Sequence, residues 1–259
     1  MILEVKDLSF SYGKKETLKN INLKVESGET VTLLGKNGSG KSTLLKNILY
    51  LLTPSSGEIT VDGKQVSSMS IRERSRLLSY IPQESRNIYS YSVLSYVLMG
   101  VTPTLSTLSS PKEKDEEAAL NALDFFGIRN LKDRDITTLS GGERQLVTAS
   151  RALVGGSRIL LFDEPTSALD YGNSECLLNL IKKLSGNGYI SIISMHSLTE
   201  ALNTASRIVL MKNGEIVFNG GIPSLIEADT LSDYYGIPIN VEYYKGQYIV
   251  LKGGRDVVE

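Results

Sequence analysis

The sequence predicts an α/β protein with a mostly parallel sheet, an N-terminal antiparallel β part and an inserted helical lobe. Three observations support this prediction. A glycine-rich loop at 35–43 joins a short apolar strand to a helix. The stretch from about 84 to 150 is mostly helical in character. Strand and helix patterns then alternate from 158 to 204, which is typical of a parallel sheet covered by helices.

The N-terminal part is predicted to consist of strands, turns and short helices. Residues 2–8 and 18–25 alternate between apolar and polar side chains, as half-buried strands do. Asp62-Gly63 is a hairpin turn signal, and Pro54 follows the first helix. The expected elements are strands at 2–8, 18–25 and 29–34, a helix at 41–51, a strand at 58–61, a helix at about 70–77 and a strand at 78–81.

The middle part is predicted to be helical. A helical run at 93–100 is followed by a Ser-, Thr- and Pro-rich stretch at 101–110 that indicates a loop. Pro111 is expected in the first turn of an acidic amphipathic helix that ends near Phe126, because its missing N–H costs nothing there. Another helix is expected at 142–153.

The last part alternates again and ends in hairpins. Asn213-Gly214 and Lys245-Gly246 are the turn signals. The expected elements are strands at 158–162 and 189–194, helices at 172–185 and 197–204, and hairpins at 207–218 and 238–251. The predicted organisation is one domain over 1–259, with a core at 1–84 and 151–220, a helical subdomain at 85–150 and a C-terminal extension at 221–259.

The composition is that of an ordinary soluble protein. The chain has 259 residues, 41% of them hydrophobic and 22% charged, with a net charge of -1. This balance gives no indication of a nucleic-acid partner. The single cysteine, Cys176, allows no intramolecular disulfide, and its helical context predicts an inert packing role. We see no signal peptide and no apolar run of the ~18 residues that span a bilayer, so we expect membrane association only through a partner.

The glycine-rich loop has the spacing of a phosphate-binding loop. Residues 35–43, GKNGSGKST, fit G-x-x-x-x-G-K-[ST] between a strand and a helix. Backbone N–H groups and the helix N-terminus favour anionic oxygens there. Lys41 is expected to contact the β- and γ-phosphates, and Ser42 to ligate Mg²⁺. The predicted nucleotide-binding residues of the loop are Gly35, Asn37, Gly38, Ser39, Gly40, Lys41, Ser42 and Thr43.

Two acids end a buried strand further along the chain. Residues 159–164 read ILLFDE, which places Asp163 and Glu164 at the carboxyl edge of the sheet, where ligands bind. Asp163 is predicted to hold Mg²⁺, directly or through water. Glu164 points elsewhere and is predicted to polarise the attacking water. Taken by itself, the segment is also compatible with a strand that ends in a polar turn before Pro165.

The segment LSGGERQ at 139–145 precedes a helix. Ser140 is a natural N-cap, and Glu143 completes a capping box three residues later. Ser140, Gly141, Gly142 and Glu143 also match a signature, LSGGQ or LSGGE, so the chain resembles the ABC ATPase family over nearly its whole length. The resemblance implies a P-loop NTPase core of the RecA type that binds ATP and Mg²⁺ and hydrolyses ATP.

The resemblance assigns further residues. Tyr12 looks like the aromatic that stacks on adenine, with Phe10 as a rival and a strand-packing role as the alternative. Gln83 looks like the glutamine that senses Mg²⁺ and the γ-phosphate. Asp170, in SALD at 167–170, looks like part of the loop that contacts the opposite subunit. His196, the only histidine, looks like the switch residue at the γ-phosphate, so the predicted catalytic residues are Lys41, Glu164 and His196.

In this family the signature of one subunit covers the phosphate loop of the other, which implies a head-to-tail homodimer that sandwiches two ATP molecules. Three positions depart from the common pattern. Lys36 stands where Pro or Arg is frequent, and Ser197 stands where Asp usually follows the histidine. The third departure, Gly155-Gly156-Ser157, replaces a polar-Pro connection.

Two further segments resemble the iron-chelate and vitamin B12 importer branch. They are YSVLSYVLMG at 91–100 and LSDYYGIPI at 231–239. The first is also compatible with a plain amphipathic helix. The branch implies a peripheral subunit at the cytoplasmic face of the cell membrane, docked near Gln83 to Tyr91 onto a polytopic permease, with an extracytoplasmic binding protein acting indirectly. Molybdate or tungstate import, and a soluble iron–sulfur assembly or repair ATPase, remain open.

Overall fold

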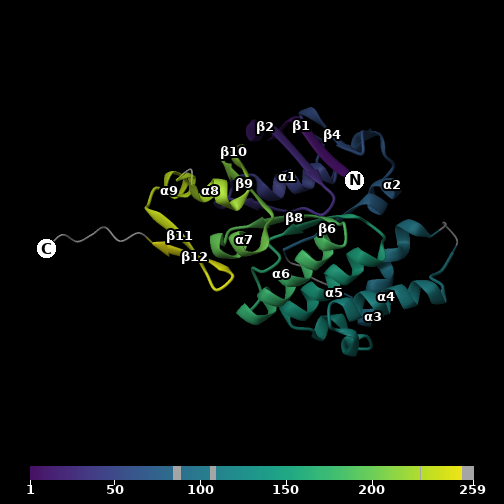
Figure 1. Cartoon of the computed structure of the whole chain (residues 1–259). Helices are drawn as coiled ribbons and strands as arrows, with labels where there is room; N and C mark the ends of the chain where they lie inside the picture. Colours follow the sequence, from purple (N-terminus) through teal and green to yellow (C-terminus); the bar gives the residue numbers. More distant parts are fainter. Residues whose placement is uncertain (84–88, 106–108, 228, 253–259) are drawn as a thin grey trace.

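We describe the fold from a computed structural model of the chain, in which residues 1–83, 89–105, 109–227 and 229–252 are placed. Two sheets and a C-terminal hairpin form the β structure (Figure 1). The first sheet is antiparallel, in the order β2-β1-β4-β5. Its strands are β1 (Ile2–Tyr12), β2 (Lys15–Glu26), β4 (Ser56–Val61) and β5 (Lys64–Gln65).

The central sheet has the order β10-β9-β3-β8-β7-β6. The pairs from β9 to β6 are parallel, and β10 is an antiparallel edge strand. The predicted mostly parallel sheet is therefore confirmed. The strands are β3 (Thr30–Leu34), β6 (Leu78–Ile81), β7 (Ile159–Asp163), β8 (Ile190–Met195), β9 (Arg207–Lys212) and β10 (Glu215–Gly220).

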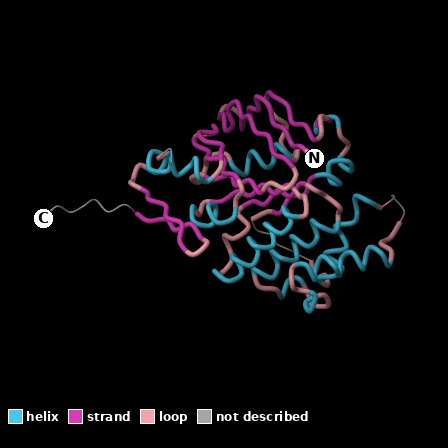
Figure 2. Tube along the Cα trace, viewed as in Figure 1, coloured by secondary structure: helices cyan, strands magenta, loops and turns pink. Residues whose placement is uncertain are grey.

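The central sheet is buried on both faces, because alternate side chains of each strand enter different apolar clusters. In β7, Ile159 and Leu161 join the cluster with α1 (Lys41–Ile48) and the antiparallel sheet. Leu160 and Phe162 join the cluster with α6 (Tyr171–Gly186), α7 (Leu198–Thr204) and the helical lobe. Figure 2 shows this central sheet between the two layers.

The helical lobe lies on one side of the central sheet (Figure 1). It consists of α3 (Val93–Leu98), the 3-10 helix η2 (Met99–Thr104), α4 (Glu113–Phe125), α5 (Gly141–Val154) and the single turns η3 (Arg129–Leu131) and η4 (Ile136–Thr138). Outside the lobe, η1 (Val66–Ser68) and α2 (Ile71–Leu77) connect β5 to β6. None of the helices in the described ranges is long and apolar enough to cross a membrane.

The C-terminal segment adds two helices that the sequence patterns did not predict. They are α8 (Ile222–Glu227) and α9 (Thr230–Tyr235). Each spans less than two turns, so neither shows a clear helical period. The predicted hairpin follows as β11 (Ile239–Tyr244) and β12 (Gln247–Lys252).

Several predicted boundaries were wrong for local reasons. The first helix ends at Ile48 because Tyr50 adopts a left-handed conformation with φ of 54°. Within the predicted loop at 101–110, η2 continues to Thr104, and the Thr104 hydroxyl donates to the Val101 carbonyl at 2.8 Å. Pro111 precedes the cap of α4, so it lies outside the helix. Cys176 is exposed, which contradicts its expected packing role.

Candidate active site

A cavity of about 730 Å³ opens where β3 ends and α1 begins. It lies at the carboxyl edge of a parallel sheet, where α/β proteins bind ligands. Most of the residues that the sequence assigned to nucleotide binding and hydrolysis line this cavity. The predicted residues that line it are Tyr12, Asn37, Gly38, Ser39, Gly40, Lys41, Ser42, Thr43, Gln83 and Glu164.

The loop that forms the floor of this cavity needs glycine at its two ends. A Cβ on Gly35 would lie 2.6 Å from the Met211 carbonyl oxygen. Gly40, the N-cap of α1, has a φ of 107°, which L side chains rarely adopt. The loop is thus packed against its surroundings on one side and leaves its other side open to the cavity.

Lys41 and Ser39 provide buried polar groups in the loop. The Lys41 side chain is 4% exposed, and its ammonium donates to the Gly35 carbonyl at 2.7 Å. Burial lowers the pKa of Lys41, against the opposing effect of Glu164 and Asp163. Ser39 Oγ is buried and has no hydrogen-bond partner among the residues that the structure describes. An unpaired buried hydroxyl and a buried cation in the same glycine-rich loop fit a site for an anionic ligand.

Asp163 ends β7 and accepts three hydroxyl donors. Ser42 Oγ and Ser194 Oγ donate to its Oδ1 at 2.8 Å and 2.6 Å. Tyr80 OH donates to its Oδ2 at 2.8 Å. Burial, followed by the bond to Asp163, raises the pKa of Tyr80. The carboxylate is held firmly beside the first turn of α1, directly against Ser42.

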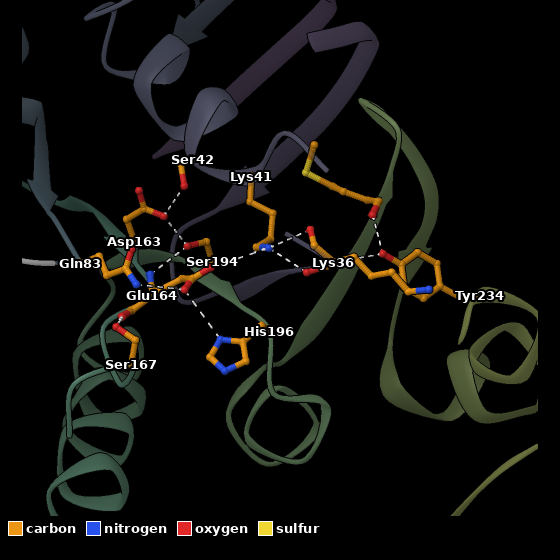
Figure 3. A network of polar contacts seen from close by, with 12 residues as sticks. Lys36, Lys41, Ser42, Gln83, Asp163, Glu164, Ser167, Ser194, His196 and Tyr234 are labelled. Carbon is orange, nitrogen blue, oxygen red and sulfur yellow. Dashed lines mark hydrogen bonds and ion pairs between the residues drawn. The ribbon is translucent and has the colours of Figure 1, made fainter. Parts of the chain in front are cut away.

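Glu164 carries the carboxylate around which the predicted catalytic groups gather (Figure 3). Gln83 Nε2 donates to Glu164 Oε2 at 3.3 Å, and His196 Nδ1 lies 3.7 Å from the same oxygen. Lys41 Nζ lies 3.9 Å from Oε1. Glu164 has a φ of +44°, and its N–H donates to Ser194 Oγ at 2.9 Å. A non-glycine residue in this left-handed region is uncommon and directs attention to function.

Tyr12 and Phe10 occupy different environments at the end of β1. Tyr12 is 50% exposed and lines the cavity, whereas Phe10 is 7% exposed and packs in the core. The two rings meet edge to face, with centroids 4.8 Å apart. Tyr12 therefore has the accessibility that base stacking requires, and Phe10 supports it from below.

The signature residues lie elsewhere, at the start of α5. Ser140 caps this helix: its Oγ accepts from the Glu143 N–H at 3.2 Å, and the Glu143 carboxylate accepts from the Ser140 N–H at 2.8 Å. Neither they nor Gly141 and Gly142 line the cavity as the structure describes it. Asp170 caps α6 and is likewise absent from that lining.

Sequence reasoning missed several groups that complete the site. Tyr80 and Ser194 bond to Asp163, and the Ser167 hydroxyl donates to the Glu164 carbonyl at 3.0 Å. The turn Asn213-Gly214 was interpreted only as a hairpin signal, yet it lines the cavity. The lining also includes Lys15, Glu16, Thr17 and Lys19, at the start of β2.

Residues 18–167 match the family model described as ABC transporter. The chain belongs to this family, and it is an ATP-binding ATPase subunit of the kind that the family contains. A Helicobacter pylori protein named as a probable iron chelatin transport ATP-binding protein is 33% identical to this chain. The match covers 96% of this chain and 99% of that protein.

Solved structures give the same result for the fold. A transporter described as being of the metal-chelate ABC type, in an inward-facing conformation, contains a chain with a TM-score of 0.84 and 28% identity, covering 99% of both chains. A dimeric ATP-binding cassette in a post-hydrolysis state, bound to ADP and phosphate, has a TM-score of 0.74 and 28% identity. That match covers 85% of this chain and 98% of the cassette. The predicted P-loop ATPase fold is confirmed.

Proposed function

We propose that this ATPase drives import of a metal chelate through a separate membrane permease, and that two copies sandwich two ATP molecules head to tail. The observation that carries the hydrolytic part is the Glu164 carboxylate, which lies within 4 Å of Lys41, Gln83 and His196 beside a phosphate-binding loop. Such a convergence of polar and titratable groups beside a cleft is the physical mark of an active site.

Phosphate binding is the task of the loop and Lys41. The N–H groups of 37–43 and the start of α1 favour the β- and γ-phosphates. Lys41 now donates to the Gly35 carbonyl and can turn to a phosphate oxygen, and Ser39 Oγ gains the partner that it lacks within the described structure. Tyr12 supplies an exposed ring for the adenine base.

Mg²⁺ would be held by the Ser42 hydroxyl, the Asp163 carboxylate and the Gln83 amide oxygen, which are the oxygen ligands that this ion prefers. The first two are already in contact at 2.8 Å. The bound ion would neutralise part of the phosphate charge. In this chain, Tyr80 and Ser194 keep the Asp163 carboxylate directed at Ser42.

Glu164 is the proposed general base. Its side chain is 18% exposed, so the carboxylate is accessible to water and still held by neighbours. Gln83 donates to Oε2 and His196 Nδ1 lies 3.7 Å from it, which leaves Oε1 to accept the proton of the attacking water. The side chain of His196 is 57% exposed and is free to contact the γ-phosphate.

The partner subunit is proposed to complete each site. Ser140, Gly141 and Gly142 present a hydroxyl and helix-start N–H groups, and they do not line their own chain's cavity as described. Asp170 lies on the neighbouring helix start. The dimeric cassette with ADP and phosphate supports this arrangement.

The cargo proposal depends on the names of relatives, and the docking proposal depends on one exposed surface. The relatives' names concern iron chelatin and metal-chelate transport, which favours an iron-siderophore, haem or cobalamin as cargo. Permease docking is proposed near Gln83 to Tyr91, at the cytoplasmic face of the membrane. Residues 84–88 lie outside the described structure, and Tyr89 and Tyr91 are exposed beside them.

Glu164→Gln tests the hydrolytic proposal. Loss of the base should reduce ATP turnover by about 10²–10⁴-fold and leave ATP-dependent dimers stable, measured by phosphate release and size-exclusion chromatography. Glu58→Gln on the antiparallel sheet is the matched control and should keep wild-type turnover. Near wild-type turnover in Glu164→Gln would reject Glu164 as the base.

Reconstitution tests the transport proposal. The chain is combined with a candidate permease in lipid vesicles, and ATP-dependent uptake of a ferric siderophore, haem, cobalamin and molybdate is measured. Uptake of one of the first three supports the proposal, whereas uptake of molybdate alone would replace the cargo. In a separate pull-down, recovery of the chain only with soluble proteins or nucleic acid would reject the proposal of an importer.

A further inference from the structure

The C-terminal segment 222–252 contacts the phosphate loop through the side chain of Tyr234. Tyr234, on α9, is 7% exposed. Its hydroxyl accepts a hydrogen bond from the Lys36 N–H at 2.9 Å and donates to the Met211 carbonyl at 2.9 Å. Figure 3 shows this contact on the side of the loop opposite to Glu164. A residue 198 positions away in the sequence therefore bonds to the second residue of the loop.

The peptide groups on either side of Lys36 are held by the loop itself. The Lys36 carbonyl accepts from the Ser39 N–H at 3.1 Å and from Lys41 Nζ at 3.4 Å. Lys41 also bonds to the Gly35 carbonyl, which belongs to the same peptide as the Lys36 N–H. Tyr234 thus fixes a peptide group whose carbonyl holds the phosphate-binding ammonium.

The Tyr234 ring is supported independently of its hydroxyl. It packs edge to face on Tyr235, with centroids 4.9 Å apart. The ammonium groups of Lys36 and Lys212 each lie 6.0 Å from its centroid, within reach of a weak cation–π attraction. Removal of the hydroxyl alone should therefore leave the ring in place.

The rest of the C-terminal segment has its own attachment to the core. The side-chain amide of Asn203, on α7, bonds the Tyr248 backbone twice: its Nδ2 donates to the carbonyl at 2.9 Å, and its Oδ1 accepts from the N–H at 2.8 Å. The hairpin therefore stays docked without the Tyr234 hydroxyl. A change at that hydroxyl reports on the loop and not on release of the segment.

We propose that Tyr234 is a positioning residue that holds the phosphate loop in its ATP-binding shape, so that ATP affinity depends on the C-terminal segment. This inference rests on the proposed function. Without the bond, the Lys36 N–H loses a part-buried partner and the loop gains conformations that ATP must remove on binding. Because linkage is reciprocal, ATP binding must in turn stabilise the contact between α9 and the loop.

Tyr234→Phe tests the proposal, with Tyr235→Phe as the matched control. The Tyr235 hydroxyl makes no hydrogen bond within the described residues, and burial raises its pKa to about 12. We expect Tyr234→Phe to raise the dissociation constant and KM for ATP about three- to tenfold, the range of one lost hydrogen bond, with kcat at saturating ATP within about twofold of wild type. Tyr235→Phe should change none of these.

A second readout separates positioning from simple stabilisation. Amide hydrogen exchange in α8 and α9 should slow when ATP binds wild type, and this protection should be lost in Tyr234→Phe. A lower Tm with wild-type ATP affinity would overturn the proposal, and so would equal effects of the two variants. If wild type itself fails to bind or hydrolyse ATP, the proposed function fails instead.

Discussion

Ser194→Ala should show how much the site depends on the serine beside Asp163. Ser194 is fully buried, its Oγ donates to the Asp163 carboxylate at 2.6 Å, and the same oxygen accepts from the Glu164 N–H. A hydrogen bond to a charged group contributes about 1.5–3 kcal/mol. The Glu164 N–H keeps the Ser194 carbonyl as a partner at 3.2 Å, so we expect a loss of about 2 kcal/mol from the carboxylate bond alone.

That loss corresponds to a fall in Tm of about 4–8 °C for a domain of this size, measured by calorimetry without nucleotide. ATP turnover should fall with it, because both acids lose a positioning contact. Ser191→Ala on the same strand is the control. Ser191 is also fully buried, but within the described residues its hydroxyl contacts only the neutral Ser185 hydroxyl, which donates to it at 3.3 Å, so Ser191→Ala should cost about 0.5–1 kcal/mol. Equal Tm losses in the two variants, or a loss under 1 °C in Ser194→Ala, would refute the reasoning.

Two further predictions concern Tyr80 and Lys41. Tyr80→Phe keeps the ring but removes the donor to Asp163 Oδ2, so half-maximal ATPase activity should need about threefold more Mg²⁺, and an unchanged Mg²⁺ titration would contradict this role. Burial lowers the pKa of Lys41, whereas ATP phosphates favour its charged form, so binding should take up a proton at alkaline pH. ATP affinity should be complete below the pKa of free Lys41 and fall as pH rises through it, which calorimetry in buffers of different ionisation enthalpy measures.

The strongest local patterns predicted the elements around the site. The glycine-rich loop predicted a strand directly before it and a helix directly after it, and the structure has β3 and α1 at these places. The capping box at Ser140 is confirmed because its chemistry is local: both hydrogen bonds join residues three apart. Turn pairs such as Asn213-Gly214 fix a left-handed backbone directly, so that hairpin is also as predicted.

Other parts of the site depend on strand order, which no local pattern contains. Ser194 reaches Asp163 because the parallel register of β7 and β8 pairs these two residues directly. Tyr80 reaches the same carboxylate because β6 lies at the other side of β7. Both side chains look like ordinary strand residues until the order β8-β7-β6 is known.

Ser140 illustrates why the structural and the functional interpretation of one motif can both hold. As a cap, its Oγ uses a lone pair to accept from the Glu143 N–H, and its own N–H goes to the Glu143 carboxylate. The bond from the Ser140 N–H is the main cause that lowers the pKa of Glu143, which keeps the carboxylate ionised and the cap intact. The N–H groups of Gly141 and Gly142 are not used by the cap, because the first N–H groups of a helix have no partner within it. A cap of this kind presets the donors that a phosphate on a facing subunit would need, so helix stability and the proposed clamp impose the same residue at position 140.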